Sequence, residues 1–281
     1  MSTADLPVHV ERCGREPGPD VDTFVLIHGY AASRFSWRSW VPRLADMGHV
    51  VSIDMKGFGA APKPDDGYYA PSDQAALVHR VIERDALQNL TLCGHSLGGG
   101  VALLTALRLQ DSGSHLSRRL VIVAGAAYEQ RLPPFVRLAK WPRLSASFFR
   151  ILGPDFVVRH VLRTIVHDRA GVTEEQVRGY ADPLRSKQAV RALLDSARQI
   201  VPLDLADVTA RFGEIAVPAL LLWGRNDRVV PLAIGERLAA ALPDARLHVL
   251  EKCGHLPVEE RPEEAWAVVE AFLADTSSPD R

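Results

Sequence analysis

Residues 92–100 read Leu-Cys-Gly-His-Ser-Leu-Gly-Gly-Gly, and this stretch decides the fold. It follows an apolar run and precedes a helical pattern, with Ser96 at the centre of Gly-x-Ser-x-Gly. Glycines on both sides of a serine permit a sharp turn from strand to helix, because larger side chains would crowd so tight a bend. A serine lifted onto such a turn is in a nucleophile's position. The motif alone is weak evidence, so the rest of the chain must supply what a nucleophilic serine requires.

Short apolar runs alternate with helical patterns along most of the chain. The runs that predict strands are residues 8–10, 23–27, 49–53, 89–93, 119–124, 217–223 and 246–250. The helical patterns between and after them are residues 34–47, 71–87, 101–109, 231–242 and 262–274, with Ser33 as a cap and Pro71 in a first turn. Such alternation is typical of an α/β fold with a mostly parallel central sheet and helices on both faces.

The alternation stops between residues 127 and 213. This segment is helical in pattern, contains a Thr173-x-x-Gln176 capping box and shows no convincing strand. It divides the chain into a first core part (1–126), an insertion (127–213) and a second core part (214–281).

The insertion is basic and carries several aromatic residues. It holds 14 Lys and Arg against 9 Asp and Glu, an excess of 14 − 9 = +5. This excess indicates either a solvated face or an arginine that pairs with an anionic group of the substrate. We expect most of its aromatic residues to form a core within the insertion and a few to line a binding pocket: Phe135, Trp141, Phe148, Phe149 and Phe156.

Composition limits the classes of function. The chain has 281 residues and a formal charge of −1, which argues against a general nucleic-acid binder and favours a small-molecule partner. Its three cysteines form no Cys-x-x-Cys pair, so neither a disulfide framework nor a zinc site is indicated. No secretory signal and no apolar run of about 20 residues is visible. We therefore expect a cytoplasmic protein with no integral membrane segment; its oligomeric state stays open.

A serine hydroxyl needs a base to take its proton and a group to orient that base. Asp227 and His255 each follow a predicted parallel strand, as Ser96 does, and the carboxyl ends of such strands are where sites assemble. Asp54 and Asp244 also lie near the ends of predicted elements and are the rival acids.

An acyl-transfer site also needs backbone donors for the oxyanion. The N–H of Leu97, at the start of the helix after Ser96, is one candidate, since the helix dipole adds partial positive charge there. The N–H of Tyr30, in the loop after the strand at 23–27, is the other. His28 and His95 flank this region, and we expect them to support the loops.

Several motifs together resemble the α/β-hydrolase fold family over nearly the whole chain. They are His28-Gly29, Asp54-x-x-Gly57-Phe58-Gly59, Gly94-His95-Ser96-Leu97-Gly98-Gly99, Gly224-x-x-Asp227-x-x-Val230-Pro231, and Gly254-His255 followed by Glu259 to Pro262. The resemblance implies an α/β-hydrolase fold in which residues 127–213 form a helical cap over the site. It also implies Ser96 as nucleophile, Asp227 as orienting acid and His255 as base. Ala60 stands where relatives often carry serine.

The expected activity is that of a carboxylesterase acting on small or medium-sized apolar esters through an acyl-enzyme, with no cofactor and no metal. The same triad also serves carbon–carbon bond hydrolases, thioesterases, acyltransferases and cofactor-free perhydrolases, and the sequence does not separate them. Aspartate-nucleophile relatives are disfavoured because residue 96 is serine. A non-catalytic ligand receptor on the same fold is the alternative from a different class.

Overall fold

The computed structural model describes residues 6–114, 116–139, 141, 145 and 149–276. Within these residues the strands form one sheet in the order β1-β3-β2-β4-β5-β6-β7, with β1 antiparallel to β3 and the other pairs parallel. The strands are β1 (His9–Gly14), β2 (Thr23–Ile27), β3 (His49–Asp54), β4 (Leu90–His95), β5 (Ser117–Val123), β6 (Ala219–Gly224) and β7 (Ala245–Leu250). The predicted mostly parallel α/β sheet is confirmed.

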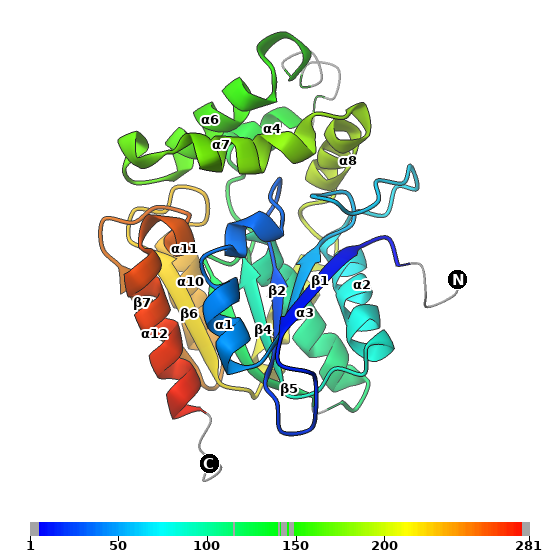
Figure 1. Ribbon diagram of the computed structural model, residues 1–281, viewed down its shortest axis with the longest axis vertical. Coiled ribbons are helices and arrows are strands. Elements are labelled where there is room, and N and C mark those ends of the chain that lie inside the picture. The colour runs from blue at the N-terminus through cyan, green and yellow to red at the C-terminus, as the bar shows by residue number, and fades with distance from the viewer. Residues whose placement is uncertain (1–5, 115, 140, 142–144, 146–148, 277–281) are drawn as a thin grey trace.

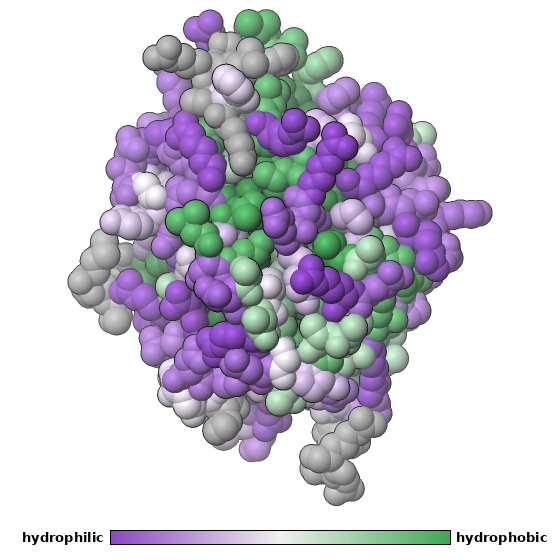
Figure 2. Space-filling model, turned by 180° about the vertical axis from the view of Figure 1, so that it is seen from behind, coloured by the Kyte–Doolittle hydropathy of each residue, from purple (hydrophilic) through white to green (hydrophobic). Residues whose placement is uncertain are grey.

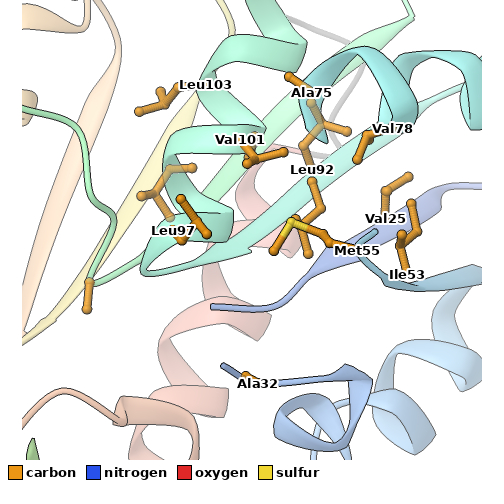
Figure 3. Packing of buried hydrophobic residues seen from close by; sticks show 14 of the residues in the cluster. Val25, Ala32, Ile53, Met55, Ala75, Val78, Leu92, Leu97, Val101 and Leu103 are labelled. Carbon is orange, nitrogen blue, oxygen red and sulfur yellow. The ribbon is translucent and has the colours of Figure 1, made fainter. Parts of the chain in front are cut away.

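Helices cover both faces of this sheet (Figure 1). One face packs on α2 (Pro71–Arg84), α3 (Leu97–Asp111) and α10 (Leu232–Ala241), and the other on α1 (Val41–Met47) and α12 (Pro262–Asp275). Successive side chains of a strand point to opposite faces, so Leu92 joins the first layer and Cys93 the second. Figure 3 shows Val25, Ile53 and Leu92 of the sheet meeting α2 and α3. Burial on both faces explains why the central strands are continuous apolar runs.

The helix predicted at residues 34–47 is two separate elements. A 3-10 helix, η1 (Arg34–Trp37), is followed by α1, which begins at Val41. Pro42 has no N–H, and its ring would clash with the carbonyl of Arg38 in a continuous α-helix, so the chain breaks before it. The predicted cap is present, because Ser33 Oγ accepts a hydrogen bond from the Phe35 N–H at 3.3 Å.

The segment between β5 and β6 is helical and lies above the carboxyl ends of the strands (Figure 1). Its elements are α4 (Pro134–Ala139), α6 (Pro154–Ile165), η2 (Arg169–Gly171), α7 (Glu174–Ala181), η3 (Asp182–Leu184), α8 (Lys187–Arg198), α9 (Leu205–Ala210) and η4 (Phe212–Glu214). The predicted capping box starts α7, where Gln176 N–H donates to Thr173 Oγ1 at 3.2 Å and Thr173 N–H donates to Gln176 Oε1 at 2.9 Å. We call this segment, residues 127–213, the cap.

One further short helix, α11 (Pro257–Glu260), precedes α12. In the part of the chain that the structure describes, no helix is both long enough and apolar enough to cross a membrane.

The turn between β4 and α3 is closely packed against β2. A Cβ atom added to Gly98 would lie 2.2 Å from the carbonyl oxygen of Ile27 and 2.4 Å from that of His28. Both contacts are with backbone atoms, which cannot rotate away as a side chain can. Glycine at this position therefore allows α3 to start directly beside the end of β2.

We expect Gly98→Ala to destabilise the protein by about 1–3 kcal/mol through overpacking. Alanine is preferred to glycine within helices by about 1 kcal/mol, so a loss of stability identifies the clash as its cause. Gly18→Ala is the matched control, because the only neighbour of its new Cβ within 4 Å is Val21 Cγ2 at 3.9 Å. Urea unfolding of both variants measures the difference, and equal stabilities would contradict the packing argument.

Candidate active site

Ser96 stands between β4 and α3 with an unusual backbone conformation. Its φ is 54° and its ψ is −119°, a region that L-residues rarely occupy. Its N–H donates to Val123 of β5, and its carbonyl accepts from the N–H groups of Gly99 and Ala126. These bonds hold the serine on the sharp turn that the sequence predicts.

The structure brings Ser96, His255 and Asp227 into one hydrogen-bonded chain. Ser96 Oγ lies 2.9 Å from His255 Nε2, and His255 Nδ1 lies 2.8 Å from Asp227 Oδ2. An ionised carboxylate can only accept a hydrogen bond, so Nδ1 carries the proton and Nε2 is left to accept from the serine hydroxyl. All three residues are buried. The arrangement is able to take a proton from Ser96 and to stabilise the imidazolium that results.

Asp227 is fixed on its other side by the backbone. Its Oδ1 accepts hydrogen bonds from the N–H groups of Val229 at 2.7 Å and Val230 at 2.9 Å. The rival acid Asp54 is occupied elsewhere, because it accepts from Arg34 N and Nη1 and from Ala60 N. The loop after β6 thus presents Asp227 to the histidine.

The two predicted oxyanion donors flank the serine. Tyr30 and Leu97 both line the cavity that contains Ser96. Within the described chain, neither backbone N–H has an intramolecular acceptor. The Tyr30 hydroxyl donates to the carbonyl of Leu193 in α8 at 3.0 Å, which ties this loop to the cap. The role of the two amides in catalysis stays a prediction.

A cavity of about 690 Å³ lies between the cap and the sheet and reaches Ser96 and His255. Its wall is mostly aliphatic and aromatic, and no Asp, Glu, Lys or Arg is among the described residues that line it. The polar side chains on it are Tyr30, His95, Ser96, Tyr128, Gln130, Ser145, His160, Thr164, Tyr180 and His255. Such a wall suits an uncharged, largely apolar ligand.

The cap aromatics differ in part from the sequence prediction. Phe135, Phe149 and Phe156 all line the cavity, and Phe135 and Phe149 also pack against buried hydrophobic residues. Trp141 is 70% exposed, because no described element packs over it, and Phe148 lies outside the described residues. Figure 2 shows hydrophobic residues at the top of the molecule and in its upper half, where the cap lies. The sequence identifies these residues as apolar but does not show which side of the cap each of them faces.

Five arginines of the cap form ion pairs at the protein surface. The pairs are Arg159 with Glu174, Arg185 with Asp155 and Asp182, Arg191 with Asp65, Arg198 with Asp195, and Arg211 with Asp111 and Glu214. These arginines do not line the cavity. For the described residues, the solvated-face interpretation accounts for the charge better than pairing with an anionic substrate.

Two buried histidines support the site, as the sequence analysis expects. His95 Nε2 donates to the His255 carbonyl at 2.8 Å, and the two rings are in contact with centroids 4.9 Å apart and planes tilted by 45°. His28 Nδ1 donates to the Gly29 carbonyl, and its Nε2 accepts from the Met55 N–H. Burial, with the neighbouring His255 adding to it, lowers the pKa of His95 to about 3. Burial also lowers the pKa of His28. Both rings are therefore neutral at physiological pH.

Among the described residues, no group of three His, Cys, Asp or Glu side chains could hold a metal ion. The cysteines are unpaired, and burial raises the pKa of the Cys93 thiol, beside the turn, to about 12. Cys93 is a buried packing residue of the α1 and α12 layer.

Glu260 contacts the histidine loop in a way that no sequence pattern indicates. Its carboxylate accepts hydrogen bonds from the N–H groups of Gly254 and Leu256, on either side of His255. The only signal in the sequence is an acidic pair at the start of a helix shortly after the histidine. Acidic residues are common at helix N-termini, so this signal does not single out a contact.

A mostly parallel sheet that carries a serine, an acid and a histidine at its strand ends defines a hydrolase of the α/β type. The chain belongs to the alpha/beta hydrolase family, whose sequence model matches residues 24–268. It is accordingly an enzyme with a small-molecule substrate.

Curated relatives agree with this class. The chain is 32% identical to the uncharacterized hydrolase YugF of Bacillus subtilis, over 87% of each chain. It is 29% identical to a pimeloyl-[acyl-carrier protein] methyl ester esterase of Nitrosomonas europaea, over 94% of this chain and 99% of the other. It is 27% identical to a 2-hydroxy-6-oxononadienedioate/2-hydroxy-6-oxononatrienedioate hydrolase of Dechloromonas aromatica, over 96% and 91%.

The depressed pKa of His95 predicts a loss of stability in acid. The folded protein keeps this ring neutral down to about pH 3, whereas the unfolded chain protonates it below its ordinary pKa of 6.5. Its contribution is therefore complete above about pH 6.5 and is lost as the pH falls towards 3. In that window each pH unit costs about 1.4 kcal/mol.

His95→Gln removes this titration. Between pH 6 and 4, we expect the unfolding free energy of the variant to depend less steeply on pH. The decrease in slope corresponds to about one fewer proton taken up on unfolding. Urea unfolding at a series of pH values measures both slopes. The same slope in the two proteins would show that His95 is already protonated in the folded state.

Proposed function

We propose that this enzyme hydrolyses carboxylic esters of small or medium-sized apolar acids, with Ser96 as nucleophile, His255 as general base and Asp227 as the orienting acid. The observation that carries the proposal is the hydrogen-bonded chain from Asp227 through His255 to Ser96, which ends at an uncharged cavity. An orienting carboxylate that is itself fixed by two backbone N–H groups suits a base that must not move during proton transfer.

The reaction runs in two steps. Ser96 Oγ attacks the ester carbonyl while His255 Nε2 takes its proton, and the N–H groups of Tyr30 and Leu97 stabilise the oxyanion. The imidazolium then protonates the leaving alcohol, and the acyl group remains on Ser96. Water, deprotonated by His255, attacks this acyl-enzyme and releases the acid. We further propose that residues 127–213 act as a cap domain that supplies the wall around the acyl group.

The lining of the cavity supports an apolar acyl group. Each methylene buried there contributes about 0.8 kcal/mol, so chain length rather than charge selects the substrate. The name of the Nitrosomonas europaea relative, a methyl ester esterase, supports the bond type.

Carbon–carbon bond hydrolysis is the second candidate, because the substrate named for the Dechloromonas aromatica relative is a keto acid without an ester bond. The substrate in that name is a dioate, which carries two carboxylates. Recognition of carboxylates in a buried site normally uses arginine or lysine. No such residue lines the cavity in the described part of this chain, so the ester is favoured. Thioesterase, acyltransferase and perhydrolase activity on the same triad remain for substrate assays to separate.

We expect Ser96→Ala to lower kcat for p-nitrophenyl butyrate by roughly a thousandfold or more, with the fold intact. Asp227→Asn should lower it by about 10³–10⁴-fold, because the amide favours the wrong tautomer of His255. Steady-state kinetics measure both effects, and circular dichroism checks the fold. A fluorophosphonate label should map to Ser96 by mass spectrometry. Near-normal turnover by Ser96→Ala would refute the assignment.

Substrate class is tested by direct comparison. We expect kcat/KM for p-nitrophenyl octanoate to exceed that for 2-hydroxy-6-oxononadienedioate by at least about a hundredfold, since two unpaired carboxylates are costly to bury. The dienedioate is followed by loss of its absorbance and the ester by release of nitrophenolate. A preference for the dienedioate would replace the ester proposal with the carbon–carbon one.

A further inference from the structure

The loop that carries His255 is bonded directly to the cap. The backbone N–H of His255 donates to the carbonyl of Ile165, the last residue of α6, at 2.9 Å. This is a bond from the backbone of the proposed base to an element of the cavity wall. Displacement of the end of α6 therefore strains or breaks a bond to His255 itself.

Close packing reinforces this bond. A Cβ atom added to Gly254 would lie 2.5 Å from the carbonyl oxygen of Ile165 and 2.7 Å from the nitrogen of His167. The cap backbone thus lies directly against the residue before His255, with no space for a side chain. The two segments, residues 165–167 and 254–256, form one packed unit.

Glu260 bonds to both segments of this unit. One of its oxygens, Oε1, accepts from the N–H groups of Gly254 and Leu256, each at 3.0 Å. The other, Oε2, accepts from Gly254 at 3.0 Å and from the His167 N–H of the cap at 2.7 Å. A carboxylate that accepts from these three N–H groups restricts the loop on both sides of His255 and joins it to the cap.

The same part of the cap touches the substrate cavity. The residues of α6 that line it are Phe156, Val157, Val158, His160, Val161, Leu162, Thr164 and Ile165. Ile165 therefore lines the acyl cavity while its carbonyl accepts from the backbone of His255. An acyl chain that fills the cavity rests against the helix whose end holds the base.

We propose that Glu260 is a positioning residue, and that it and the Ile165 carbonyl make the alignment of His255 depend on whether an acyl chain occupies the cavity. This inference rests on the proposed esterase function. Filling of the cavity orders α6, and α6 holds the histidine loop in the geometry for proton transfer. Both steps of the reaction use His255, and the acyl chain is present in both. Part of the binding energy of the chain therefore appears in kcat rather than in KM.

A merely structural Glu260 gives a different kinetic pattern. If it only stabilised the fold, its replacement would scale the rates of all esters equally. If Glu260 instead couples the filling of the cavity to the alignment of His255, its replacement reduces the dependence of kcat on acyl chain length. The dependence of KM on chain length then stays in place. Glu260→Gln is the variant to use, because it keeps the shape while replacing one accepting oxygen by a donor that cannot accept from a backbone N–H.

The kinetic test compares p-nitrophenyl acetate with p-nitrophenyl octanoate. We expect kcat in the unmodified enzyme to be about tenfold higher for octanoate. In Glu260→Gln we expect this ratio to fall below about twofold, and kcat for octanoate to fall by up to about a hundredfold, as small misplacements of catalytic groups do. Glu263→Gln is the matched control, since Glu263 is exposed and pairs with Arg43 away from the site. An unchanged ratio in Glu260→Gln would overturn the proposal.

A second measurement does not depend on turnover. Decanol, which has no ester bond, is added at increasing concentration until the backbone amides of α6 are protected from hydrogen exchange. We expect the amides of residues 254–256 to exchange about tenfold more slowly at that point in the unmodified enzyme, and no more slowly than without decanol in Glu260→Gln. Protection of 254–256 in both proteins, or in neither, contradicts the coupling. If no ester is hydrolysed, the esterase proposal fails while this measurement still decides the coupling.

Discussion

The backbone of Ser96 is the constraint on which the site depends. Residues held in sparsely populated backbone regions cost about 1–3 kcal/mol each and persist only where their surroundings fix them. Here the fixing contacts are the bonds of Ser96 to β5 and to Ala126, and the contact of Gly98 with the end of β2. The turn projects the serine hydroxyl at the edge where β6 and β7 also end. The loops after those strands then need to supply only the acid and the histidine.

The cap is part of this arrangement rather than a separate cover. Tyr30, whose backbone N–H is one of the two proposed oxyanion donors, donates a hydrogen bond to α8 through its hydroxyl. Glu259, buried beside Glu260, accepts from Gln176 and Tyr180 of the cap and from Arg38 of the core. The cap is therefore anchored next to the Tyr30 loop and next to the His255 loop. A site built in this way obtains both its shape and its alignment from contacts between distant parts of the chain.

Much of the fold and the central residues of the site are predictable from the sequence, because local patterns encode them. Apolar runs mark strands that are buried on both faces, and the Gly-x-Ser-x-Gly turn follows from sterics. The break before Pro42 was missed because the apolar spacing continues across it. The cavity wall and the role of Glu260 depend on side chains that meet only after folding, and no local pattern encodes such meetings. The exposure of Trp141 likewise depends on how the cap folds and is not encoded by a local pattern.

The uncharged wall of the cavity has a consequence for the end of each catalytic cycle. In the proposed reaction a neutral ester enters such a space at little desolvation cost, but the acid formed from it ionises at neutral pH. The resulting carboxylate finds no cation among the described lining residues, and an unpaired buried charge is strongly unfavourable. Hydrolysis therefore converts a well-matched ligand into a poorly matched one in the same place. Under the proposed function, this change of charge drives departure of the product, and accumulated acid is expected to inhibit the enzyme only weakly.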